Sequence, residues 1–233
     1  MPIFRIGLFL AALFDFDETI INLEPQHAAA SAALCRDLGS DYERLPERVR
    51  FESGRRIIDE LAEMRDLFAW TASIAELLAI RQRHFREACD RSVLVPLPCV
   101  EKVLHTLSGQ GLTLAVTSSA VGGEIDSILR RLGLRGLFSA IIDGSMVAHA
   151  KPHPEAYLVT AKTLGVVPAE CLVFEDSRVG VLSAKAAGMF CVAIRSARAR
   201  MPQDLSAADI GVSSFCELAL AGGEIRLSGV VSC

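Results

Sequence analysis

The chain has 233 residues, of which 51% are hydrophobic and 22% are charged, and its formal net charge is −4. Such a chain can bury the core of one large domain, or of one domain and a smaller one, and is not intrinsically disordered. A mild negative charge without a basic run excludes an electrostatic footprint for nucleic acid or an anionic membrane, so we expect neither partner.

The cysteines are seven in number, scattered, and without a C-x-x-C pair. Because the number is odd and several lie in apolar runs, such as Cys171 and Cys191, we expect reduced thiols and a cytoplasmic protein rather than a disulfide scaffold. The apolar residues 1–13 are too few to span a bilayer and are followed by no cleavage pattern. We interpret them as a buried central strand.

Short apolar runs alternate with helical patterns along most of the chain. Pro near the start and Gly after the end delimit three predicted helices: from about Gly122 to Gly133, from Pro154 to Gly165, and RVGVLSAKAAG, which ends at Gly188. Five runs have the composition of strands buried on both faces: GLFLAALF (7–14), LTLAVT (112–117), SAIID (139–143), CLVFE (171–175) and FCVAI (190–194). This alternation predicts an α/β fold with a Rossmann-like parallel sheet.

Residues from about 20 to 96 interrupt the alternation because they contain helical patterns and no strand pattern. Helices are predicted in EPQHAAASAALCRDLG, in SGRRIIDELAEM, and in SIAELLAIRQRHF, which starts with a capping-box pattern at Ser73 and Glu76. We therefore expect a Rossmann-like core, residues 1–19 and 97–233, and an inserted all-helical cap, residues 20–96. An insert after the first strand lies at the carboxyl ends of the strands, where open α/β sheets bind ligands. A lid is the favoured role; a helical decoration without a role is the alternative.

Reactive side chains follow four of the predicted strands, and in a parallel sheet these strand ends share one edge. In chain order the groups are Asp15 and Asp17; Thr117, Ser118 and Ser119; Lys151; and Glu175 and Asp176. Groups that are far apart in the sequence are thus expected to converge at this edge.

This set of residue types suits phosphoryl transfer. Paired carboxylates from two strands make a hard oxygen site for Mg²⁺. A carboxylate can attack phosphorus and form an aspartyl-phosphate, and a second carboxylate two residues later can transfer protons for the leaving group and the attacking water. A hydroxyl and a lysine can hold the remaining phosphoryl oxygens, where charge gathers.

The same residues resemble the motifs of the haloacid dehalogenase superfamily. DFDET (15–19), Thr117, KPHPE (151–155) and FEDS (174–177) resemble its four motifs in the right order, and the helical insert resembles its cap. The resemblance covers about residues 5–215. EPQH and KPxPE are most similar to the branch that contains β-phosphoglucomutase and small sugar-phosphate phosphatases.

The resemblance implies specific roles. Asp15 would be the nucleophile and a Mg²⁺ ligand, and Asp17 the general acid/base, with its backbone carbonyl on the metal. Thr117 and Lys151 would hold the phosphoryl group. Asp176 would bind Mg²⁺ directly or through water, with Glu175 as a further ligand or as a neighbour of the site.

Four further residues are candidates for substrate binding by position. Ser118 and Ser119 follow the second predicted strand and lie near the expected phosphate. Arg55 in the cap resembles a cation that similar caps direct toward the site, although a solvated helix face is the alternative. His27 is a candidate whose alternative role is that of a hinge or packing residue.

Two departures from the family pattern bear on function. Glu18 stands where the family usually has glycine, and the sequence offers no physical account of it. In β-phosphoglucomutase a Ser, a Lys and an Asn after the second motif help to bind the second phosphate of a bisphosphate, whereas this chain keeps Ser119 but has Ala120 and Val121. Because this chain lacks the lysine that helps to bind a second phosphate, the sequence favours a phosphatase over a mutase.

The sequence therefore predicts a Mg²⁺-dependent phosphatase that acts on small phosphorylated metabolites, such as sugar phosphates, through an aspartyl-phosphate. Asp17 fits this reaction, since the dehalogenases and phosphonate-cleaving members of the superfamily lack the second aspartate. A hexose-phosphate mutase of the β-phosphoglucomutase type is the first alternative, and a non-catalytic binding or regulatory protein with the same fold is the second. We expect a monomer or a small homo-oligomer.

Overall fold

The first strand of the main sheet lies at its centre. The computed structural model describes residues 3–51, 54–121, 123–195, 203–221 and 224–227. β2 (Ala11–Phe14) is fully buried and pairs in parallel with both β3 (Thr113–Thr117) and β5 (Cys171–Glu175). The sheet continues through β4 (Phe138–Ile142), β6 (Phe190–Ile194) and β7 (Ile210–Val212) in the order β4-β3-β2-β5-β6-β7, and every pair is parallel. The predicted α/β fold is confirmed.

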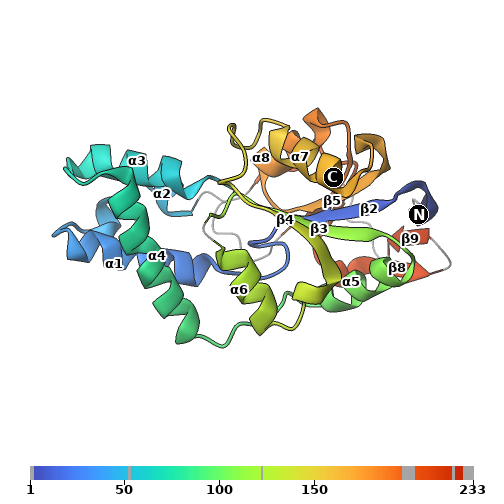
Figure 1. Ribbon diagram of the computed structural model, residues 1–233, viewed down its shortest axis with the longest axis horizontal. Coiled ribbons are helices and arrows are strands. Elements are labelled where there is room, and N and C mark those ends of the chain that lie inside the picture. The colour runs from blue at the N-terminus through green and yellow to red at the C-terminus, as the bar shows by residue number, and fades with distance from the viewer. Residues whose placement is uncertain (1–2, 52–53, 122, 196–202, 222–223, 228–233) are drawn as a thin grey trace.

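Helices cover both faces of this sheet (Figure 1). Ala12 and Phe14 of β2 belong to one hydrophobic cluster with α5 (Val100–Gly109) and α6 (Glu124–Arg131). Ala11 and Leu13 belong to a second cluster with α7 (Glu155–Leu164) and α8 (Arg178–Ala186). Because both faces are buried, β2 is apolar throughout instead of alternating. The three helices predicted in this half are confirmed as α6, α7 and α8.

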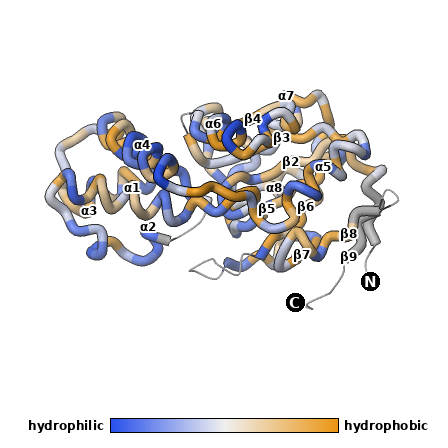
Figure 2. The backbone as a smooth tube through the Cα atoms, turned by 90° about the horizontal axis from the view of Figure 1, so that it is seen from below, coloured by the Kyte–Doolittle hydropathy of each residue, from blue (hydrophilic) through white to orange (hydrophobic). Residues whose placement is uncertain are grey.

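A second body of helices lies between β2 and α5 in the chain and beside the sheet in space (Figure 1). Leu34, Leu61 and Leu77 are fully buried in its own hydrophobic cluster. Figure 2 shows polar and apolar residues mixed along these helices, whereas the central strands are mostly apolar. The inserted helical cap is confirmed, and its described residues form α1 (Glu24–Asp37), α2 (Glu47–Phe51), α3 (Ile57–Phe68) and α4 (Ile74–Asp90).

Short sequence motifs predicted the positions of the cap helices correctly. The predicted capping box is present at the start of α4, where Ser73 Oγ accepts the backbone N–H of Glu76 at 3.3 Å and the Glu76 carboxylate accepts that of Ser73 at 2.8 Å. At the connection to the core, the backbone N–H of Leu97 donates to the carbonyl of Ile20 at 2.8 Å. The two segments that connect the core to the cap therefore lie side by side. The cap limits at residues 20 and 96 stay a prediction. No helix in the described ranges is long and apolar enough to cross a membrane.

The predicted strand over residues 7–14 is wrong in its first half. Ile6–Leu8 form a short 3₁₀ turn, and Leu8 and Leu10 are 69% and 53% exposed. Residues before this turn belong to a second, antiparallel sheet with the order β1-β9-β8, which no predicted element anticipates. Its strands are short and come from both ends of the chain: β1 (Ile3–Arg5), β8 (Leu218–Ala221) and β9 (Glu224–Leu227).

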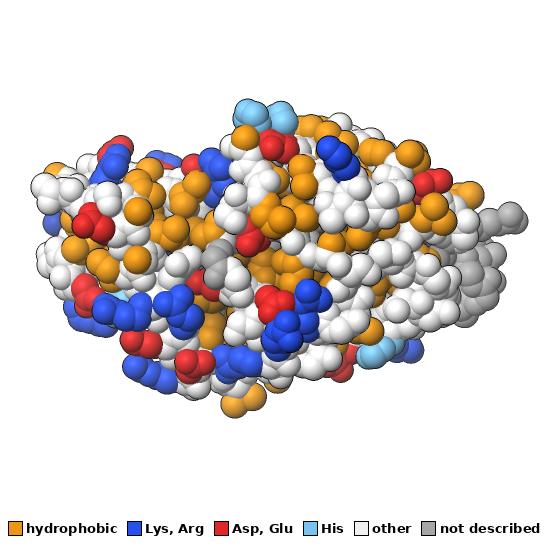
Figure 3. All heavy atoms as spheres, viewed as in Figure 1, with side chains coloured by type: hydrophobic (Ala, Val, Ile, Leu, Met, Phe, Trp, Pro, Cys, Tyr) orange, Lys and Arg blue, Asp and Glu red, His pale blue; other side chains and the backbone are white. Residues whose placement is uncertain are grey.

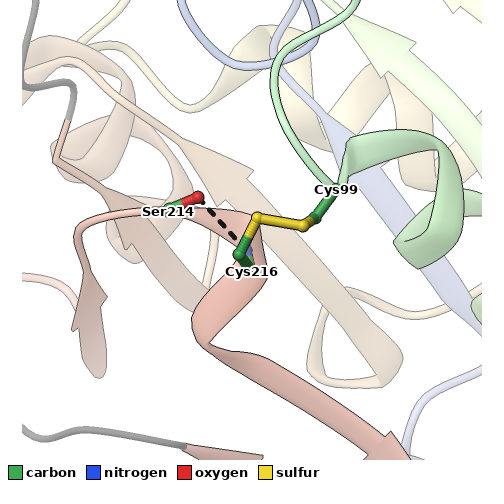
Figure 4. The surroundings of a disulfide bond; sticks show 3 residues. All are labelled: Cys99, Ser214 and Cys216. Carbon is green, nitrogen blue, oxygen red and sulfur yellow. Dashed lines mark hydrogen bonds between the residues drawn. A yellow bond between two sulfur atoms is a disulfide. The ribbon is translucent and has the colours of Figure 1, made fainter.

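Two of the cysteines that we expected to be reduced form a disulfide (Figure 4). Cys99, next to the start of α5, is bonded to Cys216, just before β8, with their Cα atoms 5.1 Å apart. The expectation of free thiols was wrong for this pair because the fold joins residues 117 positions apart, which no local spacing announces. Cys233 lies outside the described residues, and four cysteines are buried free thiols: Cys35, Cys89, Cys171 and Cys191.

Removing this disulfide is expected to lower the free energy of unfolding by about 2–4 kcal/mol, because the cross-link restricts the unfolded chain over a long loop. We expect dithiothreitol to lower the thermal unfolding midpoint of the wild-type protein. In Cys216→Ser the midpoint should be low from the start and should not respond to the reductant. A wild-type midpoint that is equal with and without reductant, after full reduction, would contradict the bond.

Candidate active site

The carboxyl ends of β2, β3 and β5 bring the predicted site residues to one edge of the sheet. Phe14 pairs with both Val116 and Phe174, so the residues that follow these three positions are neighbours. The backbone N–H of Asp15 donates to the carbonyl of Phe174 at 2.9 Å. Lys151 reaches the same place from the loop between β4 and α7. The site is deeply buried, since Asp15 and Lys151 are 8% and 7% exposed.

The ammonium group of Lys151 connects three strand ends. Its Nζ donates to Asp15 Oδ1 at 2.7 Å, to Glu175 Oε1 at 2.5 Å and to the carbonyl oxygen of Thr117 at 3.2 Å. Two buried carboxylates beside one ammonium leave an excess of negative charge. Burial accordingly raises the pKa of Asp15 to about 7, although Lys151 opposes the shift. Burial alone would lower the pKa of Lys151, but Asp15 and Glu175 raise it above its ordinary value.

Glu175 is directed toward this lysine and its own loop. Besides Lys151, its Oε1 accepts the hydroxyl of Tyr157 at 2.8 Å. Its Oε2 accepts the backbone N–H groups of Asp176 and Ser177 at 3.1 Å each. A Cβ on Gly180 would lie 1.8 Å from Glu175 Oε1, so only glycine leaves room for this carboxylate. The geometry suits a residue that positions Lys151.

Asp176 is 6% exposed and accepts the hydroxyl of Thr19 on Oδ1 at 3.2 Å. Because Thr19 is the last residue of the first motif, this bond joins the end of β5 to the loop after β2. The structure therefore brings the first and fourth motifs together around Asp15.

The carboxylate of Asp17 contacts both the loop that follows β2 and the start of the cap. Its Oδ1 accepts the backbone N–H groups of Glu18 at 3.0 Å and Leu23 at 2.7 Å, and its Oδ2 lies 3.2 Å from Nε2 of His27 on α1. On the other side of this imidazole, a guanidinium nitrogen of Arg81 lies 3.0 Å from Nδ1. A guanidinium carries donors only, so Nδ1 must accept and the ring proton must sit on Nε2. His27 therefore donates to Asp17.

Arg81 is a site residue that the sequence reasoning missed. It is 2% exposed and also donates to Ser31 Oγ at 3.1 Å. A signal was present in the sequence, since Arg81 falls on the buried face of α4 between Leu77 and Phe85, each four residues away. An arginine in the apolar stripe of a cap helix needs polar partners, and here they are part of the site.

The hydroxyls of the second motif point in different directions. Thr160 Oγ1 donates to the carbonyl of Ala156 at 2.8 Å, so it accepts from Thr117 Oγ1, which lies 2.7 Å away. Ser118 lines a cavity between cap and core, and its Oγ accepts the backbone N–H of Ala120 at 3.2 Å. Ser119 Oγ donates to the carbonyl of Gly54 in the cap at 3.0 Å. Of these three hydroxyls, that of Ser119 forms a hydrogen bond to the cap, whereas that of Thr117 points into the core.

The cavity between the two bodies contains most of the predicted binding residues. Arg55 is on its cap wall, where it donates to Glu63 at 2.8 Å. Gly54, with φ of +85°, approaches the core so closely that a Cβ would lie 2.6 Å from Ser177 Oγ. Lining residues include, from the core, Asp15, Asp17, Glu18, Ser118, Ser119 and Ala120, and from the cap, His27, Ser31, Arg50, Arg55 and Arg81.

Comparison with known proteins identifies the family. Residues 12–194 match the family of haloacid dehalogenase-like hydrolases. The chain belongs to this family. It is 33% identical to validoxylamine A 7'-phosphate phosphatase from Streptomyces hygroscopicus subsp. limoneus, over 80% of this chain and 86% of that one. It is 31% identical to fructose-1-phosphate phosphatase YqaB from Escherichia coli (strain K12), over 80% of this chain and 97% of that one.

A solved structure of β-phosphoglucomutase from Clostridium difficile has the same fold as this hydrolase. The TM-score is 0.77 and the identity 23%, covering 91% of this chain and 93% of that chain. The family resemblance that the four motifs indicated is confirmed by these comparisons.

The backbone at position 18 has a conformation that suits glycine. Glu18 has φ of 58°, in the left-handed region that side chains disfavour, and its backbone N–H donates to the carbonyl of Ile21 at 2.8 Å. This chain adopts the tight turn with a glutamate that is 5% exposed and lines the cavity. A non-glycine residue in this conformation costs about 1–2 kcal/mol.

We expect Glu18→Gly to be more stable than Glu18→Ala by about 1 kcal/mol, because both lose the carboxylate but only glycine relieves the left-handed backbone. Urea unfolding of the two variants side by side measures the difference. Both variants lack the glutamate carboxylate, so the loss of its contacts contributes equally to both free energies of unfolding and cancels in the difference. Equal stability would show that the turn is not left-handed in solution.

Proposed function

We propose that this hydrolase is a Mg²⁺-dependent phosphatase of small phosphorylated metabolites, such as sugar phosphates. The observation that carries the proposal is the pairing of Asp15 with Lys151 at 2.7 Å, beside a cavity that Asp15 and Asp17 both line. One carboxylate is thus oriented by a cation, and a second lies two residues away with an imidazole donor. The phosphatases among its relatives support this reading.

Each half of the proposed reaction uses both aspartates. A carboxylate oxygen of Asp15 forms a bond to phosphorus while the ester oxygen leaves, and Asp17 gives that oxygen a proton. Water then attacks the phosphorus of the aspartyl-phosphate and passes a proton to Asp17, and the bond from Asp15 to phosphorus breaks. Inorganic phosphate leaves, and both side chains return to their starting states. Lys151 balances the charge on the phosphoryl oxygens.

The donor set fits a magnesium ion. Asp15, Asp17 and Asp176 would hold it, since Mg²⁺ prefers hard oxygen ligands. Asp15 and Glu175 both accept from the single ammonium of Lys151, and a divalent cation would offset the negative charge that this leaves. When bound, the ion would supply positive charge to the phosphoryl group. Glu175 fits less well as a ligand, because its oxygens already accept from Lys151, Tyr157 and its own loop.

The position of the cap would control Asp17. His27 and Arg81 belong to cap helices, whereas Asp17 follows a core strand. The imidazole of His27 can therefore donate to Asp17 only while the cap lies against the core. In this structure the hydrogen bond from Ser119 to Gly54 joins the two. Closure would orient the Asp17 side chain and exclude bulk water in the same movement.

The loop after the second motif favours a phosphatase over a mutase. Val121 is 7% exposed and packs in the hydrophobic cluster of the cap, while Ala120 lines the cavity. These are the positions at which β-phosphoglucomutase carries its Lys and Asn. An apolar contact there offers no charge for a second phosphate.

Phosphate release from a panel of sugar phosphates and an aryl phosphate tests the proposal. We expect activity with Mg²⁺, its loss in EDTA and its return when Mg²⁺ is added back. Asp15→Asn should reduce turnover by about a thousandfold or more. Asp66→Asn, which changes an exposed acid on α3, is the matched control and should keep full activity.

Three outcomes of this panel would contradict the proposal. Full turnover by Asp15→Asn would exclude the aspartyl-phosphate. Isomerisation of β-glucose 1-phosphate that needs a bisphosphate primer, with little phosphate released, would indicate a mutase. No phosphate release and no isomerisation with any substrate would favour a binding protein.

Arg81→Met is expected to lower kcat about tenfold with little change in KM, because His27 would lose the contact that fixes its proton on Nε2 and Asp17 would lose an oriented donor. Arg81→Lys keeps a donor toward His27 and should recover part of the activity. The thermal midpoint checks folding, since methionine fills the buried site without leaving a charge. An unchanged pH profile and kcat in Arg81→Met would show that Arg81 has only a structural role.

A further inference from the structure

A group of side chains of the types that bind metals lies on the outer side of the loop that carries Lys151. The loop sequence HAKPHPE places His149, His153 and Glu155 around that lysine. One possible ligand atom from each lies within 4.8 Å of the others. Figure 3 shows two histidine side chains together at the upper edge of the molecule, next to an acidic side chain. The group is separate from the cavity, whose lining does not include these residues.

The carboxylate of Glu155 organises the group. It accepts the backbone N–H groups of Ala148 at 2.9 Å and His149 at 2.8 Å, and it lies 2.7 Å from Nδ1 of His149. These bonds lower the pKa of Glu155 to about 2, led by the bond from Ala148, so the group is ionised near neutral pH. The loop is thus folded back onto the first turn of α7, with an imidazole held against a carboxylate.

The second imidazole completes a three-sided arrangement. The ring of His153 lies 4.5 Å from that of His149. Its Nδ1 accepts the backbone N–H of Glu155 at 3.2 Å and is 4.0 Å from the nearer carboxylate oxygen of that residue. Ligand atoms on a tetrahedral ion with bonds of 2.0–2.1 Å are roughly 3.3 Å apart. The histidine side chains are 65% and 50% exposed, so both rings have room to rotate toward that spacing.

We propose that His149, His153 and Glu155 bind one first-row transition-metal ion of the Zn²⁺ class. Two imidazole nitrogens and one carboxylate suit Zn²⁺, Ni²⁺ or Cu²⁺, whereas Mg²⁺ prefers a set of oxygens. The ion takes the place of the proton between His149 and Glu155, and water completes its coordination. His149 precedes Lys151 and the other two ligands follow it, so the ion ties the two ends of this loop together.

Zinc binding to untagged protein in excess Mg²⁺ tests this site, with a chromophoric chelator as competitor. We expect one Zn²⁺ per wild-type chain. His149→Ala and His153→Ala should each bind it at least about tenfold more weakly. His105→Ala, which removes an exposed histidine on α5, should bind like the wild type. Asp176→Asn should also keep the site, which separates it from the carboxylates of the cavity.

Two results would overturn the proposal. One is a wild-type chain that takes up no Zn²⁺ under these conditions. The other is binding that persists unchanged in both histidine variants while Asp176→Asn loses it, which would place the ion in the cavity. Circular dichroism shows that each variant is folded before its affinity is compared. The test does not depend on phosphatase activity, so it is independent of the proposed function.

Discussion

The buried ammonium of Lys151 is the constraint on which the rest of the site depends. It donates to Asp15, Glu175 and the Thr117 carbonyl, which end the three central strands of the sheet. Without a cation there, two carboxylates would be buried side by side at a cost of several kcal/mol. The parallel sheet makes the arrangement possible because it delivers all three strand ends to one edge. Glu175, fully buried and held by its own loop, then fixes where the lysine can stand.

A second chain of contacts links the two bodies of the molecule. It runs from Arg81 through His27 to Asp17, and its direction follows from the fact that a guanidinium cannot accept a hydrogen bond. The core thus positions Asp15, and the cap positions Asp17. The two aspartates are two residues apart, yet their orientations are set by different parts of the fold. An open cap would keep Asp15 in place, whereas Asp17 would lose its His27 contact and keep the backbone N–H of Glu18.

The sequence was most informative where a local rule applied. Apolar runs predicted five of the six strands of the main sheet, and Ser73 with Glu76 predicted the start of α4, because these signals act over a few residues. The approach of Lys151 to Asp15 could be expected from the shared edge of a parallel sheet. Arg81 was missed because its partners come from another helix, and the bond between Cys99 and Cys216 because it spans 117 positions. Glu18 could be noted as unusual, but its left-handed backbone is a property of the folded turn.

The place of Val121 has a consequence for how cap and core hold together. This valine belongs to the core by sequence, yet it is buried in the hydrophobic cluster of the cap. Separating the two bodies would return its side chain to water, at a cost of about 1.5–2 kcal/mol. The burial of Val121 therefore stabilises the contact between cap and core that this structure shows. A smaller residue there would bury less apolar surface and weaken that contact.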